Sequence, residues 1–398
     1  MLNFKEAQKT ILNAVQPFES ELIFTKKSFG RVLANKVLLT RDFPDTRLSA
    51  IDGFAFCIGN EKEYRKTGTI GAGSLPSFFL EPGQCAAVMT GAPVPKGTDC
   101  MVKVEDCLET GGLVSTDEAL KLGSLINEAG SEARQGTTLA QPGARLIQSA
   151  FATLFYSGIP EVEVYRLPKI GLLITGDELC DIDDQPSTGQ VFDTNSYILK
   201  SFLSAIGLQI TSELKVKDKE TKIQGALESL ADSCDIVVSS GGVSMGKYDY
   251  IKKTFVEREY NLLIQGTAIK PGKPLMVAEK GGTLFFGMPG YPAAFLVNCL
   301  LYLIPAIKKA SGRIDHHHRL ISATLATPLK SMKGQLVCNR VKLELGDEGW
   351  VAHGAGSQTT SHFLNFCDVN GLAILAEVVG NVEPGGIVNC LHFDLELC

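Results

Sequence analysis

The segment from 168 to 315 alternates short apolar runs with helical periodicity, and this rhythm restricts the fold more than any other feature. The pattern predicts strands over 169–175, 208–216 and 235–240, with further strand and helix units ending at Phe286. A helix is expected from Asn195, as its N-cap, to Ala205. Strands that alternate with helices are typical of a doubly wound, mostly parallel sheet, so we expect an α/β domain here.

Acidic side chains lie just past the predicted strands: Glu178, Asp193, Asp218 and Asp249. The carboxyl ends of parallel strands meet at one crevice, where open α/β sheets bind ligands. Carboxylates that crowd together repel each other unless a hard cation or a shared proton neutralises them. The group therefore predicts a magnesium-assisted phosphate enzyme, although Asp218 taken alone is better explained as a helix cap.

Two further motifs suit an anionic ligand. The turn 241–246 follows an apolar strand, and its backbone N–H groups with the Ser244 hydroxyl could wrap a phosphate. A tight strand-to-helix turn explains this motif equally well, because it matches neither the Walker A pattern nor the dinucleotide fingerprint. Lys270 and Lys273 each precede a proline that stiffens the loop, which favours directed lysines over ordinary surface ones.

The length and composition of the chain limit its number of domains, its class of partner and its cellular compartment. A chain of 398 residues should form about two to four domains. Its net charge of −6 argues against a nucleic-acid partner, and its 11 scattered cysteines favour a reducing cytoplasm. We expect no signal peptide, because residues 1–6 lack a basic-then-apolar pattern. We expect no membrane span, because the apolar run 295–307 is short and contains Asn298 and Pro305. That run is interpreted as a buried helix.

The flanking segments have a different character. Residues 1–20 and 149–157 show helical patterns, whereas 45–135 and 320–398 contain short β-type runs separated by Gly and Pro. The first β region predicts a small β domain, and the second predicts a barrel or a sandwich. Three histidines at 316–318 lie on a polar linker, where solvated side chains are favoured over a metal site.

The chain resembles the molybdopterin molybdenumtransferases, a family related to the C-terminal domain of gephyrin. The resemblance covers nearly the whole length and depends on motifs that occur in the family order, at 49–55, 89–95, 175–179, 193–195, 239–244 with Asp249, 270–274, 287–290 and 361–362. It implies an elongated linker region at 1–45 and 137–167, an inserted β domain at 46–136, a molybdopterin-binding α/β domain at 168–318 and a C-terminal β-barrel at 319–398.

The resemblance also implies a reaction and an assembly. Molybdenum from molybdate would enter adenylylated molybdopterin with release of AMP and assistance from Mg²⁺. The enzyme would be a homodimer whose active site lies between the α/β domain of one subunit and other domains of its partner. A molybdopterin adenylyltransferase and other enzymes of the pathway are implied as further partners.

Residue roles follow by position from the same resemblance. Glu178, Asp218 and Asp249 would handle Mg²⁺ and the pyrophosphate, and Asp52 and Thr90 would reach in from the inserted domain. Lys270, Lys273 and Ser361 would face molybdate or phosphate oxygens. The remaining cofactor-binding residues would be Thr175, Gly176, Asp193, Asn195, Gly241, Gly242, Ser244, Pro289 and Gly290.

The sequence departs from the family pattern around the expected anion pocket. Tyr291 and Ala294 stand where many members have an asparagine and a serine, and Gln265 and Gln335 replace commonly basic residues. The arginine-rich stretch of the family appears as 127–132, in which Glu132 is kept. We therefore predict that the pyrophosphate and magnesium half of the site is intact and that molybdate binds more weakly.

Two other functions remain open. A molybdopterin adenylyltransferase shares the α/β domain, but the flanking β domains argue against it. A dimeric scaffold of the gephyrin type would need no crowded carboxylates, so Glu178, Asp218 and Asp249 favour an enzyme.

Overall fold

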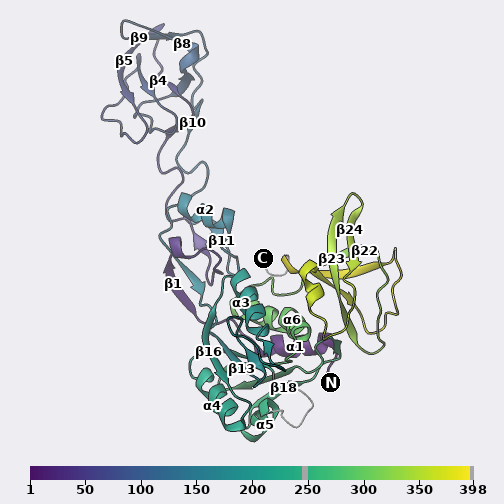
Figure 1. The fold of residues 1–398 in the computed structure, drawn as a ribbon. Coiled ribbons are helices and arrows are strands. Elements are labelled where there is room, and N and C mark those ends of the chain that lie inside the picture. The colour runs from purple at the N-terminus through teal and green to yellow at the C-terminus, as the bar shows by residue number, and fades with distance from the viewer. Residues whose placement is uncertain (244–249, 395–398) are drawn as a thin grey trace.

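The computed structural model describes residues 1–243 and 250–394. The predicted site residues Ser244 and Asp249 lie outside these ranges. Figure 1 shows an α/β domain with a β domain beside it, and a second small β domain at the far end of a slender arm. The fold is therefore mixed α/β and multidomain, as the sequence predicted.

The α/β domain is built on a six-stranded sheet in which four adjacent strands run parallel. The other two strands run antiparallel to their neighbours: β20 (Met276–Lys280) pairs with β21 (Thr283–Met288), and the edge strand β18 (Asn261–Gln265) pairs with β20. In spatial order the strands are β16 (Ile210–Val216), β13 (Ile170–Thr175), β17 (Ile236–Ser240), β21 (Thr283–Met288), β20 (Met276–Lys280) and β18 (Asn261–Gln265).

Alternate residues of the parallel strands enter two separate cores, as the period of two in a strand requires. Leu172 of β13 packs with α1 (Phe4–Ala14), α3 (Asn195–Ala205) and the long helix described below. Leu173 points the other way and packs with α4 (Glu220–Ala231) and α5 (Tyr250–Glu257). The sheet is thus covered by helices on both faces, which confirms the doubly wound prediction.

The buried helix expected at 295–307 is longer than predicted. It runs through α6 (Pro292–Asn298), the π-helical turn η3 (Cys299–Leu303) and α7 (Ile304–Ala310). Among the described residues it alone has the length and apolar composition of a membrane span, and 94% of its most apolar window is buried inside the protein. Pro292 does not shorten it, because a proline in the first helical turn removes an N–H that has no helical partner there.

The histidine run matches its prediction only at His317, which is exposed. His316 contacts the Arg313 carbonyl at 2.9 Å, and His318 contacts the Leu301 carbonyl of η3 at 3.2 Å. Gln8 of α1 donates to the same Leu301 carbonyl at 3.3 Å. Pro305, four residues after Leu301, has no N–H to donate to this carbonyl, which leaves it open to side-chain partners. His316 and His318 are thus half-buried and in polar contact with backbone carbonyls.

The arm consists of paired segments from both sides of the inserted domain. Strand β1 (Ser20–Phe24) pairs with β12 (Glu161–Tyr165), and helix α2 (Gln148–Tyr156) lies beside them. Further out, β2 (Val37–Leu38) pairs with β11 (Thr138–Ala140) and β3 (Leu48–Ser49) with β10 (Ile126–Asn127). The chain therefore runs out along the arm and returns beside itself.

The two β domains have separate sheets. The inserted domain has the strand order β7 (Cys100–Lys103), β4 (Gly53–Cys57), β6 (Gln84–Val88), β5 (Glu63–Ile70), β9 (Leu113–Thr116) and β8 (Cys107–Thr110). The C-terminal strands follow the order β23 (Leu336–Gly346), β24 (Gly349–Gly354), β22 (Leu320–Leu325), β26 (Ile387–His392) and β25 (Gly371–Leu375). Because β25 also pairs with β23, these strands close into the predicted barrel.

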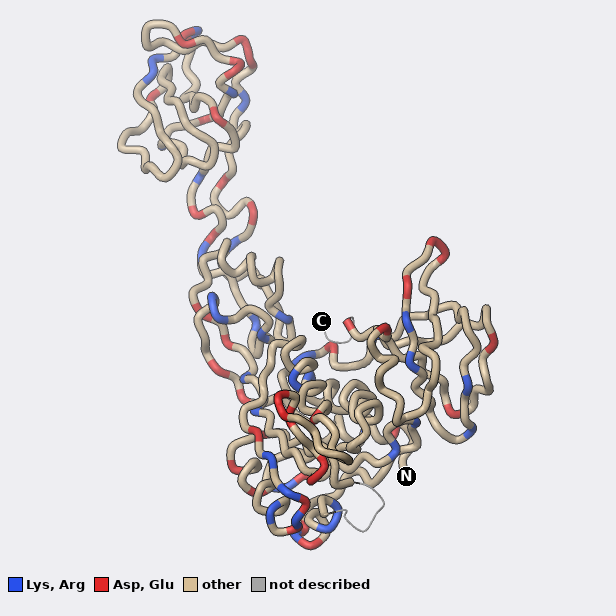
Figure 2. Tube along the Cα trace, in the orientation of Figure 1, with Lys and Arg blue, Asp and Glu red and all other residues tan. Residues whose placement is uncertain are grey.

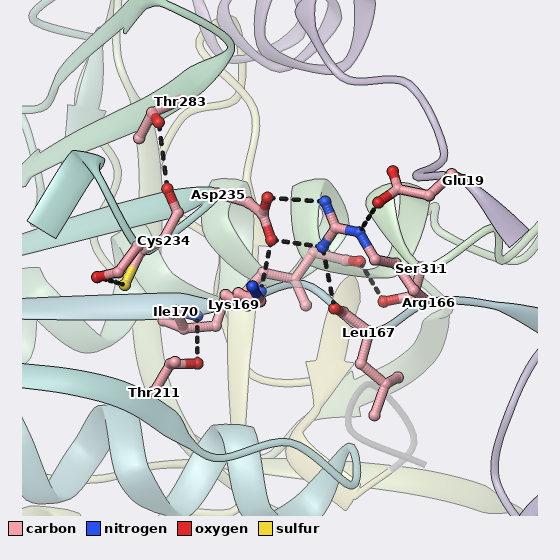
Figure 3. A network of polar contacts seen from close by, with 12 residues as sticks. Glu19, Arg166, Leu167, Lys169, Ile170, Thr211, Cys234, Asp235, Thr283 and Ser311 are labelled. Carbon is pink, nitrogen blue, oxygen red and sulfur yellow. Dashed lines mark hydrogen bonds and ion pairs between the residues drawn. The ribbon is translucent and has the colours of Figure 1, made fainter. Parts of the chain in front are cut away.

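An ion-pair network fixes the base of the arm to the α/β domain (Figure 3). Arg166 donates two hydrogen bonds to Asp235, at 2.7 and 2.8 Å, and a third to Glu19. Burial alone would raise the pKa of Asp235. The hydrogen bonds from Arg166 and from the Lys169 N–H outweigh this effect, so the pKa lies below the ordinary value. The Arg166 guanidinium also lies 4.1 Å from the Phe18 ring centroid.

Candidate active site

A cavity of about 1190 Å³ opens at the carboxyl ends of the parallel strands. Its wall combines strand ends and loops of the α/β domain with a loop of the C-terminal domain. Eleven residues predicted for the site line it: Thr175, Glu178, Asp193, Asn195, Asp218, Gly241, Gly242, Lys273, Pro289, Gly290 and Ser361. Segments far apart in the sequence therefore meet at one site.

A short parallel pairing lies between two of the carboxylates of the cavity wall. Strand β14 (Leu179–Cys180) pairs with β15 (Val191–Phe192), so that Glu178 precedes the pair and Asp193 follows it at the opposite end. Asp193 accepts hydrogen bonds from the backbone N–H and the hydroxyl of Ser196. It is therefore Asp193, and not Asn195 as the sequence suggested, whose side chain caps helix α3.

Asp218 and Glu178 face the cavity with different supports. The Thr175 hydroxyl at the end of β13 donates to Asp218. A Cβ added to Gly176 would lie 3.0 Å from the Glu178 carboxylate oxygens, so this glycine lets the carboxylate approach the backbone. The described residues contain no group of three or more His, Cys, Asp or Glu side chains that could hold a metal. The third predicted ligand, Asp249, is outside the described ranges.

The glycine turn after β17 requires its glycines. Gly241 and Gly242 have φ angles of +91° and +73°, which L side chains rarely adopt. A Cβ on Gly242 would lie 2.8 Å from Ile251 Cγ1 of α5, and one on Gly241 would lie 3.2 Å from the Thr175 carbonyl oxygen. The turn is thus packed tightly against its neighbours, with its backbone at the cavity wall.

Asn195 holds two cavity loops in place. Its amide group donates to the Ser240 hydroxyl and to the Gly290 carbonyl, both at 2.9 Å. The residue is 5% exposed, and its carbonyl oxygen has no hydrogen-bond partner within the described part of the chain. Asn195 therefore positions these two loops at the cavity that it also lines, and its contact with a ligand stays a prediction.

The two predicted lysines differ in position. Lys273 lines the cavity, whereas Lys270 is not among the lining residues and belongs to β19 (Ile269–Lys270), which pairs with β23 of the C-terminal domain. The loop between them is held by Asn298, whose amide donates to the Gly272 carbonyl at 3.1 Å. Thus one buried helix side chain fixes the lysine loop.

Arg340 positions the C-terminal loop that carries Ser361. It is 3% exposed, and its guanidinium donates to the backbone carbonyls of Ser357, Thr359 and His362. A guanidinium has enough donors in one plane to bind several carbonyls at once. Burial lowers the pKa of Arg340. The prediction of Ser361 depended on its motif, which gave no sign of this buried support.

Asp52 and Thr90 are not part of the cavity in their own chain. They lie in the inserted domain and contact each other, since the Thr90 N–H donates to Asp52 at 2.8 Å. Figure 1 places β4 and the rest of that domain at the far end of the arm, well away from β13 and α3. Within one chain, the structure does not bring these two predicted catalytic residues to the other site residues.

Several lining residues were not predicted for the site. Lys252 of α5 and the aromatic residues Phe192 and Phe363 line the cavity, as do Gln265 and Tyr291, which the sequence marked only as departures. Phe192 directly precedes the 193–195 motif, so its place in the sequence could have identified it. Phe363 directly follows the 361–362 motif and could have been identified in the same way, whereas Lys252 belongs to no motif and only the folded chain brings it to the cavity.

The fold and the cavity together define a class of protein: a ligand-binding, doubly wound α/β domain flanked by an arm and two β domains. Residues 2–158 match the family model of the MoeA N-terminal region, domains I and II, and residues 171–309 match that of a probable molybdopterin binding domain.

A molybdopterin molybdenumtransferase from a Nostoc species is 30% identical over 94% of this chain and 90% of its own length. One from Haemophilus influenzae is 28% identical over 99% of both chains. The crystal structure of a molybdopterin biosynthesis MoeA protein from Pyrococcus horikosii covers 99% of both chains with a TM-score of 0.86 and 25% identity. The chain belongs to the molybdopterin molybdenumtransferase family.

Proposed function

We propose that this protein inserts molybdenum from molybdate into adenylylated molybdopterin and releases AMP. The observation that carries this proposal is one cavity in which Glu178, Asp218 and Lys273 meet the glycine turn at 241–242. Cleavage of a pyrophosphate link needs charge neutralisation and alignment rather than a covalent nucleophile. The turn and the lysine supply donors to oxyanions, and the carboxylates supply ligands to a cation.

Magnesium fits the carboxylates of the cavity. Mg²⁺ is usually held by one or two protein carboxylates and takes its other ligands from water and substrate phosphates. Glu178 and Asp218 therefore suffice as ligands, although within the described ranges they do not belong to a group of three or more possible metal ligands. The bound ion would neutralise phosphate charge, while the Thr175 hydroxyl holds Asp218 in its orientation.

The molybdate half of the site is expected to be weaker than in the family. Gln265 and Tyr291 both line the cavity, where relatives place a basic residue and an asparagine. The neutral Gln265 amide attracts a tetrahedral dianion less than a basic side chain does, and the Tyr291 phenol takes the place of an amide that can donate two hydrogen bonds. Half-saturation of cofactor assembly should therefore need more molybdate than in a typical relative, and a typical requirement would contradict this expectation.

A homodimer would explain the distant positions of Asp52 and Thr90. The arm carries them away from their own cavity, so they would serve a second subunit. The arm and its α2 helix also expose apolar side chains that suit contact with a second copy: Leu22, Phe24, Phe29, Phe155 and Tyr156 are each at least half exposed. We further propose a cytoplasmic location and a molybdopterin adenylyltransferase as the partner that supplies the substrate.

AMP release tests this function against its alternatives. The purified protein would be incubated with adenylylated molybdopterin, Mg²⁺ and molybdate, and AMP would be quantified by chromatography. A molybdenumtransferase releases AMP, an adenylyltransferase makes the adenylylated compound from ATP, and a scaffold does neither. The family membership and the β domains beside the α/β domain favour the first outcome.

A further inference from the structure

Lys252 contributes a positive charge to the cavity wall that no sequence motif indicates. It lies in the first turn of α5, directly after Ile251 and directly before Lys253. Successive helix residues point about 100° apart, so these three side chains face different surroundings. Ile251 is fully buried in the core of the sheet, Lys252 lines the cavity, and Lys253 faces α4.

Contacts of Ile251 place this turn of α5 beside the glycine turn. A Cβ on Gly242 would lie 2.8 Å from Ile251 Cγ1, and one on Gly287 of β21 would lie 3.3 Å from Ile251 Cγ2. The α5 backbone is thus fixed against both the glycine turn and the central sheet. Lys252 therefore extends from a fixed helix turn and lines the same cavity as Gly241 and Gly242.

The acidic residues of the cavity wall suggest why a lysine is needed there. Among the described lining residues, Glu178, Asp193 and Asp218 are acidic, and Lys273 is the other lysine. A phosphate at the glycine turn would face these carboxylates, and a nearby ammonium offsets their repulsion. We propose that Lys252 binds a phosphate oxygen of the nucleotide half of the substrate, and so determines affinity for the adenylyl group. This inference depends on the proposed function.

The adjacent Lys253 is a matched control. Its ammonium lies 2.8 Å from Glu220 and 3.7 Å from Glu257, and it does not line the cavity. Lys252→Ala and Lys253→Ala change the net charge equally and sit one residue apart in the same helix. Binding of AMP with Mg²⁺ would be measured by calorimetric titration of the full chain for wild type, both alanine variants and Lys252→Arg. Thermal unfolding of each variant would verify folding.

We expect Lys252→Ala to weaken AMP binding about tenfold, the usual effect of losing a hydrogen bond to a charged group. Lys252→Arg should recover part of the affinity, and Lys253→Ala should match wild type within about twofold. The molybdate concentration for half-maximal assembly should be unchanged in Lys252→Ala; a rise in this value with AMP binding intact would assign the lysine to molybdate and overturn the proposal.

Equal AMP affinity for Lys252→Ala and Lys253→Ala would also overturn it, because net charge alone would then explain any effect. The proposed function fails separately, if wild type binds AMP but releases none from adenylylated molybdopterin. The two failures are therefore distinguishable.

Discussion

At the scale of single residues, the hydrogen bond that the Thr175 hydroxyl donates to Asp218 supports one of the two carboxylates proposed to hold Mg²⁺. Asp218→Asn removes a charge at the pyrophosphate, so AMP release should fall about 100-fold in kcat/KM. Thr175→Val leaves the carboxylate in place without its donor and should cost about tenfold. Both values would come from initial rates at saturating Mg²⁺.

Thr175→Ser serves as the control, because it keeps the hydroxyl and removes only a methyl group. It should retain activity close to wild type. If Thr175→Val were as active as Thr175→Ser, the hydroxyl would have no positioning role.

Residue identity alone gave a large part of the site but assigned some roles wrongly. Motif residues such as Glu178, Asp218 and Lys273 line one cavity, because positions just past parallel strands must converge. Asn195 was expected to cap a helix, yet its side chain is buried and holds two loops instead. Burial of a polar side chain depends on tertiary packing, which local sequence patterns do not record.

At the scale of secondary-structure elements, a hydrogen bond joins the long helix, next to its π turn, to the lysine loop. Asn298 directly precedes η3 and donates to the Gly272 carbonyl between Lys270 and Lys273. Asn298→Ala would leave that carbonyl unpaired and free the loop to move. We expect the molybdate requirement for assembly to rise about tenfold, with AMP binding unchanged.

Cys299→Ala is the comparison for this variant. Cys299 is equally buried in the same helix and lies next to Asn298, so its truncation reproduces the loss of packing but not of the hydrogen bond. The same rise in the molybdate requirement for both variants would show that helix packing, rather than the Asn298 amide, controls the loop.

The base of the arm should be sensitive to acid through Asp235. Its native pKa lies below the ordinary value of 3.8, so its contribution to stability is complete above that value and disappears as pH falls through the native pKa. Asp235→Asn should lower the free energy of unfolding by about 2 kcal/mol at pH 7. This difference between the variant and wild type should shrink below about pH 4.

Urea unfolding at a series of pH values would measure this difference. Asp232→Asn, an exposed carboxylate in the same segment, is the control and should track wild type. A difference for Asp235→Asn that stays constant down to pH 2.5 would contradict the assignment of the stabilising charge to Asp235.

At the scale of the whole molecule, a site shared between subunits predicts complementation. Asp52→Ala should remove the contribution of the inserted domain to catalysis, and Asp218→Ala should remove that of the cavity. Random mixing makes half of the dimers mixed, and each mixed dimer has one of two sites intact, so about a quarter of wild-type activity should return. Subunits would be mixed after partial unfolding, and AMP release would be measured.

The matched control mixes Asp218→Ala with Thr175→Val, because both changes affect the same cavity. This pair should not regain activity beyond that of Thr175→Val alone. Recovery in both mixtures, or in neither, would exclude a site built from the inserted domain of one subunit and the cavity of another.

Domain architecture was predictable because strand and helix periods are local properties of the chain. The α/β rhythm and the β-type flanks both match the fold. The antiparallel placement of β20, the closure of β25 onto β23 and the pairing of β14 with β15 depend on contacts between distant segments, which periodicity does not specify. Figure 2 shows acidic and basic residues interspersed along the arm and over the lower part of the α/β domain, an arrangement that net charge alone leaves open.

The doubled course of the chain along the arm has a consequence for protein engineering. Leu48 and Ser49 pair with Asn127 and Ile126, so the polypeptide enters and leaves the inserted domain at one place. The domain is therefore a cassette attached through two adjoining junctions. A hybrid that carries the inserted domain of a relative needs only those two junctions rejoined. Its activity would show whether differences in activity between family members come from the inserted domain or from the α/β domain.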